Sequence, residues 1–259
     1  MSIALTTMNA KPLILLVGFA LIIPFSQCEK YRKHVYIPDA AFLNALIIGG
    51  VDTNGDGKIS PAEAEVVTYL NVSEKGISDM TGIEAFINLD TLFCSKNQLT
   101  SLDVSENAGL HILLCPGNQL TSLNVSSNFA LTVLQCYDNQ LTSVDVSNRP
   151  DLYIFHCFNN RLTSLDVTKS TKLVHFWCYD NQLNSLDVSN NTMLKSLYCE
   201  NNQLASLDVS NNTRLRNLKL GEMPSLTEVC VWILPFPPEE VHVNTEGSPN
   251  VHFTTECSK

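Results

Sequence analysis

Hydrophobic residues recur at a constant interval along most of this chain. An apolar-x-x-apolar-x-apolar phrase spans residues 89–94 and again 99–104, and the pair of phrases then repeats every 21 residues. Alternation with period two at the end of each phrase is typical of a short strand. The pattern therefore predicts a solenoid in which each coil carries a strand on both sides of a flattened tube.

Six of the nine cysteines follow the same period. They are Cys94, Cys115, Cys136, Cys157, Cys178 and Cys199. Cysteines in register could also be metal ligands or form disulfides. Each of them, however, takes the place of an inward leucine, and a free cysteine behaves as a small buried hydrophobic residue. Neighbouring parallel strands also hold their side chains too far apart for unstrained bridges. We therefore predict that these six ladder cysteines line the core.

An asparagine lies three positions after each ladder cysteine. The six are Asn97, Asn118, Asn139, Asn160, Asn181 and Asn202. A side-chain amide can both donate and accept hydrogen bonds, and buried turn backbone requires such partners. We expect these amides to join each coil to its neighbour.

The repeat resembles a known class of bacterial leucine-rich repeats. Its consensus, Leu-x-x-Leu-x-Cys-x-x-Asn-x-Leu-Thr-Ser-Leu-Asp-Val-Ser, is similar to the 21-residue IRREKO class over about residues 68–231, with Phe155 and Phe176 replacing the second leucine. That class is common in secreted and lipid-anchored proteins of Bacteroidetes and is internalin-like. The resemblance implies a leucine-rich-repeat solenoid in an exported protein.

The N-terminus resembles an export signal. Residues 12–25 are almost wholly apolar, but the run is shorter than the ~20 residues of a membrane span and fits a signal-peptide core. Residues 25–28, Phe-Ser-Gln-Cys, resemble a bacterial lipoprotein cleavage site, with Gln27 as a departure. We predict a lipid anchor at Cys28 and an outer-membrane or cell-surface location; ordinary cleavage and secretion are the alternative.

A segment before the coils matches the calcium loop of an EF-hand at every ligand position. The expected ligands are Asp52, Asn54, Asp56, the carbonyl of Lys58, Ser60 and Glu63. Residues 39–47 before the loop and 61–67 after it can form helices. An ordinary turn with a Ser60–Glu63 capping box is the simpler interpretation and is compatible with the first. We expect one structural calcium ion in the N-terminal cap.

These patterns divide the chain into five segments. They are a signal peptide with a lipoprotein cleavage motif (1–28), a helical cap with the EF-hand-like loop (29–67), a degenerate first coil (68–88), the leucine-rich-repeat solenoid (89–231) and a short β C-terminal cap (232–259). In the last segment, residues 241–243 and 251–253 flank a Gly-Ser-Pro-Asn turn, which predicts a small hairpin. Cys230 and Cys257 fall outside the ladder, so in an exported protein they form either a disulfide or two free thiols.

Charge and motif content narrow the function. The chain of 259 residues has 26 acidic against 16 basic side chains, for a formal net charge of -10, and no stripe of lysine or arginine. Nucleic-acid binding requires clustered basic residues, so it is excluded. Gly-rich phosphate loops, His-Glu-x-x-His and Gly-x-Ser-x-Gly do not occur in the sequence. We therefore do not expect an enzyme.

The positions beside the ladder cysteines are expected to point outward, and in the central coils many are aromatic. With their neighbours they form a predicted face of Tyr137, Tyr153, His156, Phe158, His175, Trp177, Tyr179 and Tyr198. Strands ~4.8 Å apart would merge these side chains into one surface. Tyrosine and tryptophan are enriched at interface anchors. The face predicts a binding module for a protein or a glycan. The alternative is a structural cell-envelope scaffold without a dedicated ligand, whose aromatic residues merely suit strands.

A row of acidic residues is expected on the opposite side of the tube. It comprises Asp103, Asp145, Asp166, Asp187 and Asp208, with Asn124 at the equivalent position of one coil. Stacked carboxylates could attract cations. Serines and threonines frame each of them, so we expect these aspartates to hydrogen-bond their own turns.

Overall fold

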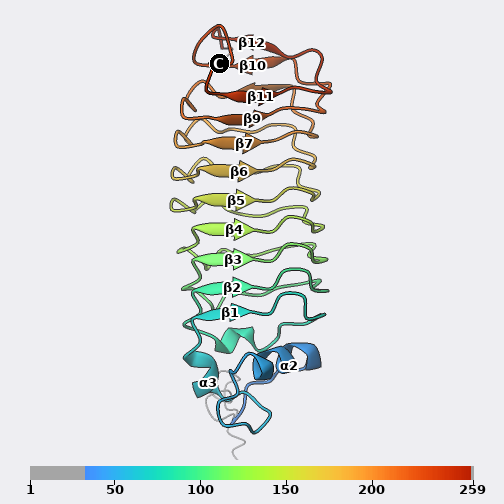
Figure 1. The fold of residues 1–259 in the computed structure, drawn as a ribbon, viewed down its shortest axis with the longest axis vertical. Coiled ribbons are helices and arrows are strands. Elements are labelled where there is room, and N and C mark those ends of the chain that lie inside the picture. The colour runs from blue at the N-terminus through green and yellow to red at the C-terminus, as the bar shows by residue number, and fades with distance from the viewer. Residues whose placement is uncertain (1–32, 258–259) are drawn as a thin grey trace, which may run out of the picture. The chain divides into compact units, whose positions relative to one another are not determined.

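The computed structural model of this protein describes residues 33–257. The predicted signal peptide and the candidate lipid anchor Cys28 lie outside these residues. From His34 onward, the chain forms a solenoid that leads from a small helical cap to a β C-terminal cap (Figure 1). No helix in the described part of the chain is long and apolar enough to cross a membrane.

One parallel sheet runs along the solenoid, and its nine strands stack as rungs in Figure 1. In pairing order they are β1 (Tyr69–Asn71), β2 (Thr91–Phe93), β3 (Ile112–Leu114), β4 (Val133–Gln135), β5 (Ile154–His156), β6 (His175–Trp177), β7 (Ser196–Tyr198), β9 (Asn217–Lys219) and β11 (His242–Asn244). Leu92 pairs with Leu113, and Leu113 pairs with Leu134, so the register advances by one repeat per strand. The leucine-rich-repeat solenoid is confirmed.

The inward side of this sheet forms a continuous apolar core. The middle residues of β1 to β7 and of β9 are buried, and so are the six ladder cysteines, which have free thiols. Phe155 and Phe176 stack inside the tube with their ring centroids 5.5 Å apart. Burial raises the pKa of all six thiols, that of Cys115 to about 12, which keeps them protonated. The prediction that these cysteines line the core is confirmed.

The asparagine after each ladder cysteine ties neighbouring coils together. Oδ1 of Asn160 accepts a hydrogen bond from the backbone N–H of Leu141 at 2.9 Å. Its Nδ2 donates to the carbonyl oxygens of Cys136 and Cys157, at 3.1 and 3.0 Å. One side chain thus satisfies buried backbone groups of two successive coils, as predicted. Related bonds are made by Asn97, Asn118, Asn139, Asn181 and Asn202.

A second row of asparagines lies at the turn that precedes the strands of the long sheet. Nδ2 of Asn128 donates to the carbonyl oxygens of Val104 and Asn107, both at 2.9 Å. The same kind of bond recurs at Asn107, Asn191 and Asn212. Arg149 and Ser170 take the two intervening positions. The row is therefore interrupted in the middle of the solenoid.

Arg149 fits this row poorly. Its side chain is 2% exposed, and its Nε has no hydrogen-bond partner. The guanidinium donates to the carbonyl oxygens of Val125 and Asn148, and it lies 5.1 Å from the ring centroid of Phe129. Burial lowers the pKa of Arg149. A buried cation that is held mainly by carbonyl groups costs more free energy than a neutral amide that makes the same bonds.

We expect the Arg149→Asn variant to be more stable than the wild type by about 1–2 kcal/mol. An asparagine there would donate to the carbonyl oxygens of Val125 and Asn128, as Asn128 does one coil earlier. Urea denaturation measures the difference. Arg161→Asn changes an exposed side chain and serves as the control, with an expected effect within about 0.5 kcal/mol. A lower midpoint for Arg149→Asn would contradict this account of the row.

The other side of the tube is less regular than predicted. Strands there are β8 (Ser206–Asp208), β10 (Glu228–Cys230) and β12 (His252–Thr254), and among the earlier coils the structure has only isolated bridges in the described residues, such as Asp103 with Asn124. In these coils an aspartate accepts a hydrogen bond from the backbone two residues later, as Asp166 does from Thr168 at 2.9 Å. The same bond is present at Asp208, the last residue of β8, so it marks where each of these segments turns.

The predicted C-terminal hairpin is wrong. β11 pairs in parallel with β9, and β12 pairs in parallel with β10, so the two segments lie in different sheets and add a further coil. Ser248 supports this coil: its hydroxyl donates to the carbonyl of Leu220 at 2.7 Å and accepts from the N–H of Met223 at 2.8 Å. A hairpin would have left the backbone edges of the preceding coil unpaired, whereas two parallel strands satisfy both.

Short helices close the N-terminal end. They are α2 (Ala40–Ile48) and α3 (Pro61–Glu65), and the 3-10 helix η1 (Ile83–Ala85) follows in the first coil. Asp39 caps α2 by accepting from the N–H of Phe42, and its second carboxylate oxygen accepts from the N–H of Ser78, both at 2.9 Å. Ser60 and Glu63 form the predicted capping box at α3. Asp39 thus links the helical cap to the first coil.

Candidate functional site

The outward side of the long sheet is apolar and aromatic over its central coils. The middle residue of each strand points into the core, so the residues on either side of it point outward. We call the outward residues of β2 to β7, with the residue after each ladder cysteine, the outer strand face. All the aromatic residues predicted from the sequence lie on this face or at its edge.

The residues directly after three ladder cysteines form a first aromatic ladder: Tyr137, Phe158 and Tyr179. The rings of Tyr137 and Phe158 are 4.2 Å apart with an interplanar angle of 11°. Those of Phe158 and Tyr179 are 4.3 Å apart with an angle of 9°. Equal spacing in three consecutive coils holds these rings parallel, and all three stay partly exposed.

The residues directly before three ladder cysteines form a second aromatic ladder: His156, Trp177 and Tyr198. The rings of His156 and Trp177 stack at 3.9 Å, and those of Trp177 and Tyr198 at 5.0 Å. Nζ of Lys219 lies 4.2 Å from the ring centroid of Tyr198 and ends the ladder with a cation–π contact. Phe158 and Trp177 lie 6.4 Å apart, so the two ladders form one continuous surface.

His156 is less accessible than the sequence predicted. It is 8% exposed because it packs against the ring of Trp177. Its Nε2 has no hydrogen-bond partner. Burial, and to a smaller extent the neighbouring His175, lower the pKa of His156 to about 4. The imidazole is therefore neutral at pH 7 and supports Trp177, and it is not positioned to meet a ligand directly.

His175 and Tyr153 border the second ladder. Nδ1 of His175 lies 2.8 Å from the hydroxyl oxygen of Ser196, which also accepts from Nε1 of Trp177 at 3.3 Å. Burial lowers the pKa of His175 as well. Tyr153 is 43% exposed and packs edge-on against His175, with ring centroids 6.1 Å apart. Together these contacts fix the orientation of the Trp177 ring.

Carboxylates border the first aromatic ladder. Asp138 and Asp180 follow two of its rungs, and each accepts a hydrogen bond at 2.6 Å from the asparagine of the next coil, Asn159 and Asn201 respectively. Glu200 takes the rung position in the coil after Tyr179. We call Asp138, Asp180 and Glu200 the acidic rim.

The acidic rim makes its surroundings electronegative. Glu200 lies 3.8 Å from Nζ of Lys219, and its other carboxylate oxygen is buried without a partner. Burial raises the pKa of Glu200. The pKa of Tyr179 is raised to about 12, first by burial and then by the charges of the rim. Burial is the larger cause of both shifts, and the neighbouring carboxylates add to each of them.

The outer strand face extends further than the sequence analysis predicted. Phe93, Ile112, Leu114 and Val133 also point outward and are partly exposed. Tyr69, which is 56% exposed, packs edge-on against Phe93 at 5.5 Å. The sequence contains a signal for this extension, because these apolar residues occupy the same positions relative to the ladder cysteines as His175 and the aromatic residues of the second ladder. The prediction followed aromatic side chains only.

The EF-hand-like loop is closed by its own hydrogen bonds. Asp52 accepts from the N–H of Gly57 at 2.9 Å, and Gly57 has a φ of 76°, which favours glycine. Glu63 accepts from the N–H groups of Thr53 and Ser60, both at 2.9 Å, and so joins the two ends of the loop. These bonds, led by that from Ser60, lower the pKa of Glu63 to about 2. The other predicted ligands, Asn54, Asp56 and Lys58, lie on the exposed turn.

The carboxylates of this loop are not drawn together. Among the described histidine, cysteine, aspartate and glutamate side chains, one group of three has its ligand atoms within 4.8 Å of one another. It consists of Asp208, Cys230 and Cys257 and contains no residue of the loop. The two cysteines of that group are joined in a disulfide, with Cα atoms 5.5 Å apart, so they offer no thiolate to a metal. A cation in the loop would require Asp52, Asp56 and Glu63 to move closer to one another.

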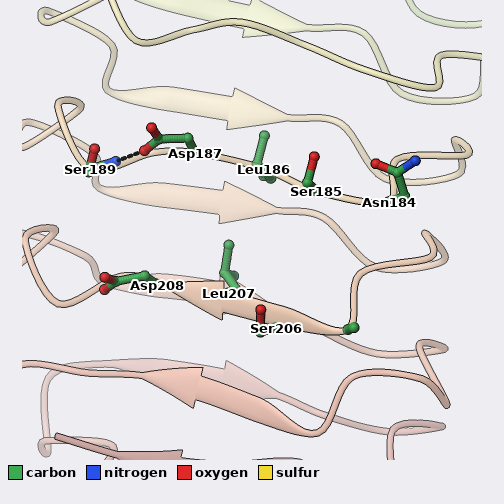
Figure 2. Close-up of a pocket in the computed structure, with 9 residues that line it drawn as sticks. Asn184, Ser185, Leu186, Asp187, Ser189, Ser206, Leu207 and Asp208 are labelled. Carbon is green, nitrogen blue, oxygen red and sulfur yellow. Dashed lines mark hydrogen bonds between the residues drawn. The ribbon is translucent and has the colours of Figure 1, made fainter. Parts of the chain in front are cut away.

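An open pocket of about 340 Å³ lies on the opposite side of the tube. Figure 2 shows residues 185–187 of one coil beside residues 206–208 of the next, with matching side chains at matching positions. Asp187 accepts from the N–H of Ser189 at 2.9 Å, and Asp208 makes the same bond one coil later. These aspartates hydrogen-bond their own turns, as predicted, so the pocket is a product of the repeat.

Comparison with known proteins shows which solved structures are similar to this fold. No family model matches the chain. It is 37% identical over 72 residues to internalin J of Listeria monocytogenes, a match that covers 28% of this chain and 8% of that protein. The solved "functional domain of InlJ" from the same species, whose description says that it "includes a cysteine ladder", has a TM-score of 0.52 and 28% identity over 75% of this chain and 56% of that chain.

Two further solved structures share the fold. They are internalin C2 of Listeria monocytogenes, with a TM-score of 0.61 and 23% identity over 84% of this chain and 94% of that chain, and YopM of Yersinia pestis, with a TM-score of 0.57 and 24% identity over 72% and 56%. The chain thus spans a small part of internalin J and about half of its solved domain. It has an internalin-like leucine-rich-repeat fold built from coils of 21 residues.

Proposed function

We propose that this protein is an exported binding module that recognises a protein or a glycan through its outer strand face. One observation carries the proposal: two parallel stacks of aromatic rings lie side by side on that face, and all their members except His156 stay partly exposed. Contiguous exposed apolar surface is costly unless a partner covers it, and tyrosine and tryptophan are frequent interface anchors. A rigid solenoid presents such a surface without loss of conformational entropy.

Two features support export. Residues 12–25 have the composition of a signal-peptide core, and Cys28 directly follows a lipoprotein-like motif. The disulfide between Cys230 and Cys257 is typical of proteins in oxidising compartments. We propose a lipid anchor at Cys28 as the membrane attachment, with free secretion as the alternative.

The Trp177→Ala/Tyr179→Ala double variant tests the face. Each ring is expected to act as an anchor worth about 2 kcal/mol, so the double variant should weaken binding by about 4 kcal/mol, roughly 800-fold. The measurement is a screen of immobilised extracellular proteins and glycans with the wild type, followed by titration of each hit with both proteins. Phe129→Ala is the matched control, because Phe129 is 65% exposed but lies outside the outer strand face.

Undiminished binding by the double variant would remove the face from consideration. A wild type without any ligand in the screen would favour the alternative, a cell-envelope scaffold. A catalytic role has little support. His175 lies within hydrogen-bond distance of the Ser196 hydroxyl, but it has no carboxylate partner in the described part of the chain. Among the described histidines, only His111 forms an ion pair with a carboxylate, that of Asp90.

We also propose that the loop of residues 52–63 holds one calcium ion. Its oxygen donors suit a hard cation, and the bond from Gly57 to Asp52 preforms the turn. Asp52, Asn54, Asp56, Ser60 and Glu63 would supply side-chain oxygens and Lys58 its carbonyl. Such an ion would add to the hydrogen bonds by which Glu63 joins the two ends of the loop.

Calcium at about ten times a Kd of ~10⁻⁴ M should stabilise the protein by about 1.4 kcal/mol relative to chelator. Thermal melts with and without the ion measure this difference in wild type, Glu63→Gln and Asp187→Asn. Glu63→Gln lowers the melting temperature by itself, so the readout is the calcium-dependent increment. That increment should vanish in Glu63→Gln and persist in Asp187→Asn. A wild-type melt that ignores chelator argues against the ion.

A further inference from the structure

The geometry of the aromatic ladders restricts the class of partner. Within both ladders the rings are parallel and 3.9 to 5.0 Å apart, so neighbours cover both faces of Phe158 and of Trp177. The free face of Tyr198 is covered by Lys219. A sugar ring stacks on the flat face of an aromatic ring, and the central rungs have no such face to offer.

The ladders instead present ring edges and tyrosine hydroxyls to the outside. Ring edges carry partial positive charge and attract carbonyl oxygens, and the hydroxyls of Tyr137, Tyr179 and Tyr198 can donate and accept hydrogen bonds. Peptide groups and apolar side chains match this chemistry. The surface therefore suits a polypeptide better than a carbohydrate.

The acidic rim sets the sign of the partner's charge. Within the described part of the chain, no lysine or arginine forms an ion pair with Asp138 or Asp180, whose partners are asparagine amides. Glu200 has Lys219 on one oxygen and no partner on the other. Asp138 and Asp180 therefore carry charges that no cation of the described residues neutralises, whereas the second oxygen of Glu200 is buried and only adds to the negative potential.

The other edge of the strands does not offset this charge. There Lys172 is paired with Asp151 at 2.6 Å, and Arg216 is paired with Glu240 at 3.2 Å. Lys195 has no carboxylate within 4.0 Å among the residues that the structure describes. Arg161, an exposed residue in the turn after Phe158, likewise has no carboxylate within 4.0 Å among these residues. The three carboxylates of the acidic rim still outnumber Lys219 and Arg161, so the net charge beside the first ladder is negative, and Lys195 stands across the strands from it.

We infer that the outer strand face takes a polypeptide segment rich in lysine or arginine, with its cations at the acidic rim and its backbone and apolar side chains against the ring edges. This inference rests on the proposed function and narrows it from a protein or glycan to a basic polypeptide. Charge complementarity of this kind speeds association and rejects acidic partners.

Three probes test it by calorimetry at low ionic strength: a synthetic peptide of repeated Lys-Gly-Phe-Gly units, the same peptide with Glu for Lys, and chitohexaose. The lysine peptide should bind the wild type, and the other two should not. Asp138→Asn/Asp180→Asn should weaken that binding about tenfold, since each charge contact is worth up to ~1 kcal/mol. Asp145→Asn/Asp187→Asn removes the same charge on the opposite side and should change the Kd less than about twofold.

Each contrary outcome has its own meaning. Equal weakening by both charge variants would show attraction to net charge alone and would overturn the inference, as would a lysine peptide that does not bind. The wild type could instead bind the glutamate peptide or chitohexaose, and the Trp177→Ala/Tyr179→Ala variant could lose that binding. This result would overturn the inference of a basic partner, while the proposed function of the face would stand. Lysine-peptide binding that depends on the rim but ignores the aromatic variant would contradict the proposed function and leave the basic partner in place.

Discussion

Replacing Asn160 with alanine is expected to lower the free energy of unfolding by about 3–5 kcal/mol. The side chain accepts from the N–H of Leu141 and donates to the carbonyl oxygens of Cys136 and Cys157. Alanine leaves the N–H of Leu141 inside the tube without a partner, which costs about 1–3 kcal/mol before relaxation. It also removes one of the two amide donors from each of these carbonyl oxygens, which still accept from Asn139 and Asn181 respectively, at about 0.5–1.5 kcal/mol per lost bond. Urea denaturation followed by circular dichroism measures the loss.

The effect should also reach beyond one coil. In a solenoid each coil is stabilised by its neighbours, so damage at a central junction lowers the cooperativity between the two halves. A broader transition is therefore expected. Asn184→Ala, at an exposed position, is the control and should fall within about 0.5 kcal/mol of the wild type. A loss below about 1 kcal/mol for Asn160→Ala would mean that these amides do not hold the coils together.

Acidification from pH 6.5 to pH 4 is expected to remove about 3 kcal/mol of stability through His156 alone. In the folded protein the pKa of His156 is about 4, well below the 6.5 of an unperturbed imidazole in the unfolded chain. Between these values the unfolded chain binds a proton that the folded protein does not. The stabilisation is thus complete above pH 6.5 and is lost as the pH falls toward 4.

The His156→Phe variant isolates this contribution. Phenylalanine can stack on Trp177 but does not titrate, so the difference in stability between variant and wild type should grow as the pH falls through that window. Asp39 and Glu63, whose folded pKa values are about 2, lose their contributions mainly below pH 4 and do so equally in both proteins. Parallel pH profiles for the two proteins would contradict the assignment.

The repeat made most of the fold predictable from the sequence. A constant interval between ladder cysteines specifies coil length, inward positions and register at once, and the asparagine three residues later could be assigned its role from hydrogen-bonding capacity alone. The capping box of Ser60 and Glu63 was equally local. Such features depend on residues close in sequence or on strict periodicity, and both can be read without coordinates.

The features that the sequence does not predict depend on contacts between residues that are distant in the chain. The sequence predicts a hairpin at the end of the solenoid because the prediction uses local turn residues only. These residues do not show that the preceding coil has an unpaired strand edge on each side of the tube. The sequence predicts an exposed His156 because the alternation along a strand gives the direction of each side chain. It does not show that the ring of a neighbouring residue covers that side chain. The row of Asn107 and Asn128 was overlooked because Arg149 and Ser170 interrupt it. The acidic rim escaped notice because its three members occupy two different positions of the coil.

The constant register has a consequence for how such a protein changes length. Since each strand from β2 to β7 pairs with its neighbour at an offset of one repeat, excising or duplicating any whole unit returns the chain to an equivalent junction. The tube can grow or shrink in steps of ~4.8 Å while its hydrogen bonds remain complete. Length and surface chemistry are therefore separately adjustable, and a gain or loss of units before Tyr137 would move the aromatic stacks along the axis without altering them.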